Sequence, residues 1–174
     1  MKFTYITKVF TLALMAICCV YAKGEELNEK NYFNRLTNKG ENIWIATSKG
    51  VIKYNKTEGE AYNANKVLGV ENDDVVNCIK SDRGGKIWFS VEGKGIFCYD
   101  EEKITKRNDL YIESLLRLSF AFNSNDSIWI SAGGYYVSPF IDDRQIGYTT
   151  PDNYSMDKKA YIMDMEFDSK GNLW

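Results

Sequence analysis

The chain has 174 residues, of which 44% are hydrophobic, 26% charged and 14% aromatic, and its 22 Lys and Arg against 24 Asp and Glu give a net charge of −2. This composition is that of a globular protein; it excludes a collagen-like fibre, a coiled coil and a disordered tail and gives no support to nucleic-acid binding. Histidine is absent, which excludes Ser-His-Asp and Cys-His catalytic systems and histidine-ligated zinc. We predict no cofactor and no metal.

The sequence of residues 1–22 indicates a secretory signal peptide. Lys2 and Lys8 precede an uncharged apolar run at 9–20, which is the pattern of an export signal. The run is shorter than the about 20 apolar residues that a membrane span needs. We therefore expect an exported, periplasmic chain of residues 23–174; an uncleaved signal that acts as an anchor is the alternative.

The four tryptophans mark an internal repeat. They are spaced 44, 41 and 45 residues apart, at Trp44, Trp88, Trp129 and Trp174. An Asn or Asp stands six positions before each of them, at Asn38, Asp82, Asn123 and Asp168. A period in the low forties is typical of β-propeller blades and not of leucine-rich or ankyrin repeats. We interpret all eight residues as structural, with the tryptophans in the core.

Each repeat is expected to form a blade of four antiparallel strands. In the second unit the strands are predicted at 75–81, 86–91, 95–100 and 103–107. Residues 82–86 and 168–172 begin with Asp and contain Gly, a combination that favours tight hairpins. In the third unit Asn and Asp at 123–126 take the place of the turn glycine, because they tolerate the left-handed backbone region best.

The predicted fold class is therefore all-β, a truncated propeller of about three and a half blades, where about four are the usual minimum. The repeat units cover about residues 30–73, 74–114, 115–159 and 160–174. Within the third unit, residues 142–159 are expected to form a long loop between strands.

No disulfide is expected in the exported part of the chain. Cys78 and Cys98 are placed on the first and third strands of the second blade, so about 9 to 10 Å would separate them. A disulfide needs Cα atoms within about 7 Å. We expect two free, buried thiols.

The string at 164–174 resembles the two-component regulator propeller repeat, in which an Asp, two variable residues, a Gly, a variable residue and a Leu or Ile precede the Trp. Residues 82–97 match this pattern through a second hairpin, and 38–54 match it more loosely. The third unit departs from it. The resemblance implies a piece of the periplasmic sensor region of a hybrid two-component histidine kinase and response regulator.

The resemblance further implies a function and partners. The ligand would be an oligosaccharide, the remaining blades and the downstream signalling domains would lie outside this chain, and the parent protein would be anchored in the inner membrane and form a homodimer. Kinase activity is not expected in this chain. The alternatives are a secreted propeller scaffold for protein association and a polysaccharide lyase, which the absence of histidine and of a converging acid–base pair disfavours.

Two pairs of residues are candidates for ligand binding. Asp164 and Glu166 alternate with Asp168 along one predicted strand, so their carboxylates share a face. Tyr135 and Tyr136 offer aromatic surfaces suited to sugar rings. Solvent-facing carboxylates and tyrosines packed at blade edges are the alternative interpretation. The tyrosines that are weaker candidates are Tyr62, Tyr111, Tyr148 and Tyr154. No catalytic residue is proposed.

Overall fold

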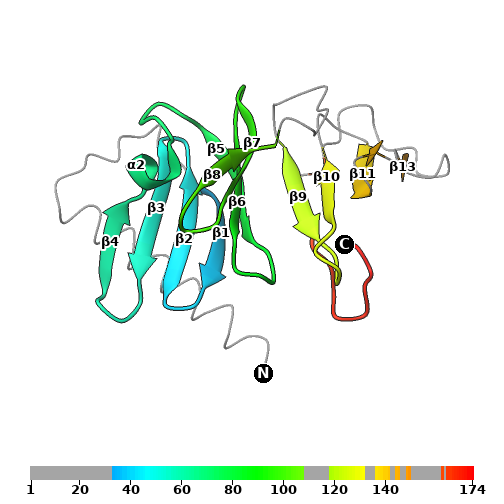
Figure 1. The fold of residues 1–174 in the computed structure, drawn as a ribbon, viewed down its shortest axis with the longest axis horizontal. Coiled ribbons are helices and arrows are strands. Elements are labelled where there is room, and N and C mark those ends of the chain that lie inside the picture. The colour runs from blue at the N-terminus through cyan, green and yellow to red at the C-terminus, as the bar shows by residue number, and fades with distance from the viewer. Residues whose placement is uncertain are drawn as a thin grey trace.

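The computed structural model describes residues 33–107, 118–131, 136–141, 144–145, 148–149, 162 and 164–174. These ranges form three antiparallel sheets that follow one another along the chain. Figure 1 shows them side by side, from β4 at one end of the molecule to β13 at the other. The predicted signal peptide lies outside the described residues.

The first sheet is a meander in the order β1-β2-β3-β4. Its strands, followed by one short helix, are β1 (Phe33–Lys39), β2 (Asn42–Thr47), β3 (Gly50–Asn55), β4 (Glu60–Asn63) and α2 (Asn65–Leu68). The β2–β3 turn requires glycine, since Gly50 has a φ of +95° and an added Cβ would lie 2.0 Å from Asn65 Oδ1. That oxygen accepts a hydrogen bond from the Val51 N–H at 2.7 Å, which ties α2 to the sheet.

The second sheet has the same topology and confirms the four strands predicted for the second unit to within one residue at each end. The strands are β5 (Val76–Ser81), β6 (Ile87–Val91), β7 (Gly95–Tyr99) and β8 (Ile104–Lys106). A bulge lies between Val76 and Cys78. Cys78 on β5 and Cys98 on β7 lie on either side of β6, and both are buried free thiols.

The third sheet is less regular. Its strands are β9 (Ser119–Phe122), β10 (Ile128–Ser131), β11 (Tyr136–Ile141), β12 (Arg144–Gln145) and β13 (Tyr148–Thr149). The expectation of an uninterrupted loop over 142–159 is wrong at its start, because β12 and β13 both pair with β11. Residues 150–159 lie outside the described residues.

The hairpin turns repeat from unit to unit. In the second, third and fourth units the N–H of the turn Asp or Asn donates to the carbonyl four residues on, as at Asp82, Asn123 and Asp168. The residue that closes each turn has a positive φ, at Gly85, Asp126 and Gly171. Asp126, at +57°, confirms that Asp can replace the turn glycine in the third unit. In the fourth unit the turn leads to a bridge between Phe167 and Leu173.

The core lies between the sheets. One buried cluster joins the first and second sheets and includes Trp44, Val51, Ile79 and Phe89. A second cluster joins the second and third sheets and includes Trp88, Ile96, Phe120 and Ile130. Strand β6 is buried on both faces. Its apolar residues therefore do not alternate with polar ones. This stacking of four-stranded sheets confirms the all-β propeller-blade fold.

Three of the four repeat tryptophans contact an aromatic ring of the following unit. The ring centroids are 6.1 Å apart for Trp44 and Tyr99, 5.4 Å for Trp88 and Phe122, and 5.6 Å for Trp129 and Phe167. The prediction that all four lie in the core is wrong for Trp174, which is 78% exposed, because no described element packs against its ring.

Candidate functional site

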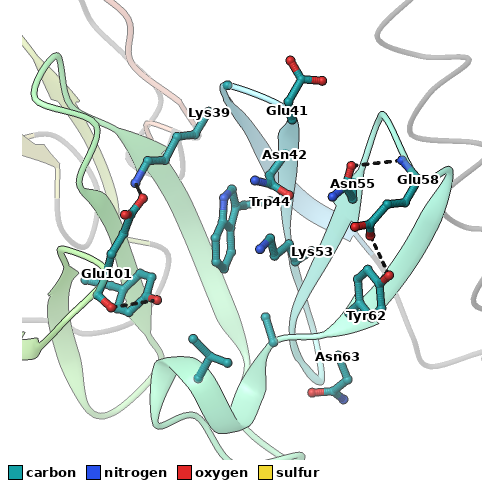
Figure 2. A pocket seen from close by; sticks show the side chains of 14 residues that line it. Lys39, Glu41, Asn42, Trp44, Lys53, Asn55, Glu58, Tyr62, Asn63 and Glu101 are labelled. Atoms are coloured by element: carbon teal, nitrogen blue, oxygen red, sulfur yellow. Dashed lines mark hydrogen bonds and ion pairs between the residues drawn. The ribbon is translucent and has the colours of Figure 1, made fainter.

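A cavity of about 840 Å³ lies between the first sheet and the β7–β8 end of the second sheet. We call it the Trp44 cavity. Figure 2 shows its polar and aromatic side chains converging from both sheets. Those that carry the argument below are Asn42, Trp44, Lys53, Glu58, Tyr62, Tyr99 and Glu101, which all line the cavity.

A row of three side chains forms the wall that the first sheet contributes. Trp44 on β2 is the cross-strand partner of Lys53 on β3, and Lys53 is the partner of Tyr62 on β4. Directly paired residues in an antiparallel sheet point to the same face, so the three lie side by side toward the second sheet. The neighbouring positions Ile43 and Ile45 belong to a cluster on the opposite face.

The Lys53 ammonium lies 5.5 Å from the centroid of the Trp44 ring, which is within the range of a cation–π contact. Tyr99 approaches the same indole from the second sheet, with the planes tilted by 58°. Lys53 is half-buried and Trp44 is 4% exposed. The cavity therefore combines an aromatic wall with a cation held against it.

Hydrogen bonds hold the tyrosine and one lysine of the cavity in place. The Tyr62 hydroxyl lies 2.7 Å from a Glu58 carboxylate oxygen and 2.9 Å from one of Glu60, and these contacts raise the pKa of Tyr62 well above its ordinary value. Lys39 in the first sheet donates to Glu101 at 2.7 Å, which crosses to the second sheet. This contact lowers the pKa of Glu101.

Two polar atoms at the cavity are buried without a hydrogen-bond partner, the Trp44 Nε1 and the Asn42 Oδ1. Buried polar atoms are nearly always paired, and leaving one unpaired costs about 1 to 3 kcal/mol. One atom is a donor and the other an acceptor, and both are shielded from solvent in this structure.

The predicted site residues Asp164 and Glu166 lie elsewhere, in a cluster of ion pairs between the units. Asp164 lies 3.2 Å from the Arg35 Nε and 3.5 Å from the Lys80 ammonium, and Glu166 lies 2.5 Å from the same ammonium. Lys80 also donates to the Met165 carbonyl. These carboxylates therefore link the fourth unit to β1 and β5, and they do not reach the Trp44 cavity.

The structure does not test the prediction that Tyr135 and Tyr136 bind a ligand. Tyr135 lies outside the described residues, and of Tyr136 only the backbone, at the start of β11, is described. Sequence reasoning treated Trp44 as core alone and Tyr62 as a weaker candidate. One feature of the sequence could have pointed to the cavity. The position paired with the repeat tryptophan holds a charged residue, Lys53, in the first unit and the apolar Cys98 in the second.

The part of the chain that the structure describes contains no group of three or more Cys, Asp or Glu placed to hold a metal ion. The helical part of the described chain is too short and too polar to cross a membrane.

Comparison with solved structures places this fold among known ones. The chain is similar to the extracellular domain of the putative hybrid two component system BT3049 from B. thetaiotaomicron, with a TM-score of 0.55 and 18% identity over 87% of this chain and 21% of that one. It is also similar to YCF48 bound to D1 peptide, with a TM-score of 0.53 and 13% identity over 86% of this chain and 47% of that one.

The chain thus spans about a fifth of one of these structures and about half of the other. No protein-family profile matches the sequence, and no curated protein matches it. At these identities the similarity shows the fold, a set of stacked propeller blades.

Proposed function

We propose that this chain is a non-catalytic, ligand-sensing part of an exported signalling protein of the hybrid two-component kind, and that it binds an oligosaccharide in the Trp44 cavity. The repeat at 164–174 and the similarity to an extracellular domain of such a system support the signalling context. In this proposal the parent protein acts in the periplasm, is anchored in the inner membrane, forms a homodimer and supplies the remaining blades and the signalling domains.

The observation that carries the ligand class is the row of Trp44, Lys53 and Tyr62 along one wall of the cavity. Sugar-binding sites combine aromatic faces with a few oriented polar groups. Tyr62 is 41% exposed, so its ring is accessible. Glu58 and Glu60 hold its hydroxyl and so limit the rotation of the side chain.

The absence of catalysis is part of the proposal. Acid–base cleavage of a glycosidic bond needs two carboxyl groups that converge on one bond. At this cavity the carboxylates have protein partners, since Glu101 binds Lys39, Glu58 accepts from Tyr62 and Glu41 accepts from Thr57. We expect bound oligosaccharides to be recovered uncleaved.

Calorimetric titration of the full chain with a panel of oligosaccharides from plant and animal polysaccharides tests the proposal. Tyr62→Ala removes the exposed ring and should weaken binding about tenfold. Tyr62→Phe is the matched control, because it keeps the ring and should change the affinity much less. The absence of binding across the panel, or equal affinities of wild type and Tyr62→Ala, would contradict oligosaccharide binding in this cavity.

A scaffold that associates with proteins is the second candidate function. It is favoured by the similarity to YCF48, whose solved structure carries a bound peptide. If oligosaccharides do not bind and a peptide library is enriched for binders that compete with one another at the Trp44 cavity, this second function replaces the first.

A further inference from the structure

One position of the first unit breaks the repeat in a way that points to the charge of the ligand. The residue paired with the repeat tryptophan is Cys98 in the second sheet, where it is buried, and Lys53 in the first. Both face the next unit. Lysine seldom occupies a half-buried position inside an interface unless its charge has a partner.

Among the described residues, Lys53 is the cation of the Trp44 cavity that lacks a carboxylate partner. Lys39, the other lysine there, is neutralised by Glu101 at 2.7 Å. The Lys53 ammonium contacts the Trp44 ring, and Figure 2 shows it directed toward that ring, away from Glu58. Its field helps to lower the pKa of Glu101, but the carboxylate itself is bound to Lys39.

The carboxylates lie at the exposed edge of the cavity, whereas Lys53 lies against its aromatic wall. Glu41, Glu58 and Glu101 are all exposed, and each has the protein partner described above. A densely charged polyanion would be repelled by these three side chains. A single anionic group that reaches past them would find an ammonium without a counter-ion and a low-dielectric wall that strengthens the attraction.

We propose that the Trp44 cavity recognises an acidic oligosaccharide, whose carboxylate or sulfate group binds the Lys53 ammonium while a sugar ring packs beside Tyr62. This inference rests on the proposed function and specifies its ligand class. It also gives a role to the row that contains the lysine, since Trp44 and Tyr62 are the cross-strand partners of Lys53 on its two sides.

The test compares acidic oligosaccharides with neutral ones of the same length, by calorimetric titration of the full chain. Trigalacturonate and its fully methyl-esterified form are one pair, and a sulfated trisaccharide of neutral galactose residues and its desulfated form are the other; the two pairs distinguish carboxylate from sulfate. Within the same experiment the broader panel described above supplies further acidic and neutral members. We expect the acidic members to bind more tightly and their affinity to fall as ionic strength rises.

The decisive variant is Lys53→Met, which keeps the alkyl length against Trp44 and removes the charge. It should weaken the binding of the acidic ligand about 10- to 100-fold, the range for a lost hydrogen bond to a charged group, and Lys53→Arg should retain most of it. Lys49→Met is the matched control, since Lys49 is exposed and does not line the cavity. Thermal melting of each variant shows whether it is folded.

The outcomes separate the two proposals. Binding of neutral oligosaccharides that Lys53→Met leaves unchanged would overturn the acidic ligand and keep the sensing function. Equal loss in Lys53→Met and Lys49→Met would also overturn it, because the effect would then be one of overall charge. No binding by any member of the panel would overturn both.

Discussion

The interface between the second and third sheets and the interface between the first and second sheets are built on the same repeat, but they are packed to different degrees. The first and second sheets leave a cavity of about 840 Å³, and we call this the open interface. The second and third sheets leave one of about 220 Å³ beside Asp82 and Phe122, and we call this the closed interface. In the closed one, Trp88 donates its indole N–H to an Asp82 carboxylate oxygen at 2.8 Å. Phe122 packs at 5.4 Å from its ring, and the Arg107 guanidinium lies 5.3 Å from the centroid. Both the N–H and the ring of the Trp88 indole thus have partners.

In the open interface the equivalent Trp44 has no acceptor for its N–H. Asn38 stands where the second unit has Asp82, and its side-chain oxygen accepts a hydrogen bond from the Lys56 ammonium. The β1–β2 turn is also shorter, since Lys39 pairs directly with Asn42. A carboxylate has two acceptor oxygens and an amide only one, so the first unit cannot satisfy both its turn and its indole as the second unit does.

Two positions distinguish the closed interface from the open one. One is the turn residue six positions before the tryptophan, and the other is the residue paired with the tryptophan across the strand. Asp82 and Cys98 give a closed interface, whereas Asn38 and Lys53 leave a cavity.

The largest effect on the free energy of unfolding is expected at the glycine of the β2–β3 turn, compared with the equivalent glycine of the β6–β7 turn. Gly50→Ala should destabilise the protein by about 3 kcal/mol, because the added Cβ overlaps the Asn65 side chain and the positive φ disfavours any L-residue. Asn65 cannot move aside cheaply, since it is buried and bonded to Val51, Lys49 and Asn72. Denaturant unfolding followed by circular dichroism measures the loss.

Gly95→Ala is the control for that substitution. Gly95 begins β7 as Gly50 begins β3, with a φ of +110°, but the nearest atom to an added Cβ is the Lys106 side chain at 3.6 Å. Only the backbone strain remains, about 1 kcal/mol. Equal losses in the two variants would show that Asn65 does not anchor the first interface as described.

A smaller loss of stability is expected from Asp82→Asn, which gives the closed interface the turn residue type of the open one. Asp82→Asn keeps an oxygen for the Lys86 N–H but removes the acceptor of the Trp88 indole. The free energy of unfolding should fall by about 1 to 2 kcal/mol. In a Trp88→Phe background, which has no indole N–H, the same substitution should cost clearly less.

The matched variant in the open interface is Asn38→Ala, which should cost less than Asp82→Asn. Asn38 is exposed and its side chain has no bond to the indole. If Asn38→Ala proved as costly as Asp82→Asn, the contrast between the two turns would be refuted.

The smallest effect concerns the ion pair that crosses the open interface. Because Lys39 holds the pKa of Glu101 below its usual 4.5, the pair contributes stability above that pH and loses it as the pH falls through the lowered pKa. Lys39→Met should return the pKa of Glu101 toward 4.5 and change stability little, since the pair is exposed. Carboxyl NMR titration measures the shift.

Asp100 provides an internal control in the same titration. Its pKa is also lowered, but by the backbone N–H of Lys103, so Lys39→Met should leave it unchanged. A Glu101 pKa that did not respond to Lys39→Met, or that moved together with that of Asp100, would argue against a specific bridge across the cavity.

The sequence predicted the blades well because their determinants are local. The tryptophan period, the Asp or Asn six positions earlier and the turn residues lie within one hairpin, and the four strands of the second unit followed from them. Even the missing glycine of the third unit was predictable, since Asp126 tolerates a positive φ. The outer strands β12 and β13 were missed because each pairs over only two residues, too few to show a period.

The candidate site was predicted poorly, and the reason is distance along the chain. Asp164 and Glu166 look like a free acidic face when read alone, but Lys80 and Arg35, which neutralise them, lie more than 80 residues away. The Trp44 cavity likewise draws on Lys53 and Glu101 from different units. Pairing across units cannot be read from a pattern that repeats within one unit.

The spacing of the tryptophans and the chemistry of the turns were therefore sufficient to specify the four-stranded order of the regular blade and the stacking of one blade on the next, but not the outer strands β12 and β13. Which interface closes and which holds a cavity was decided only in the tertiary structure. An indole is satisfied, or a lysine left without a counter-ion, according to the side chains that neighbouring units bring within a few ångströms of it, and that proximity is a property of the packed sheets.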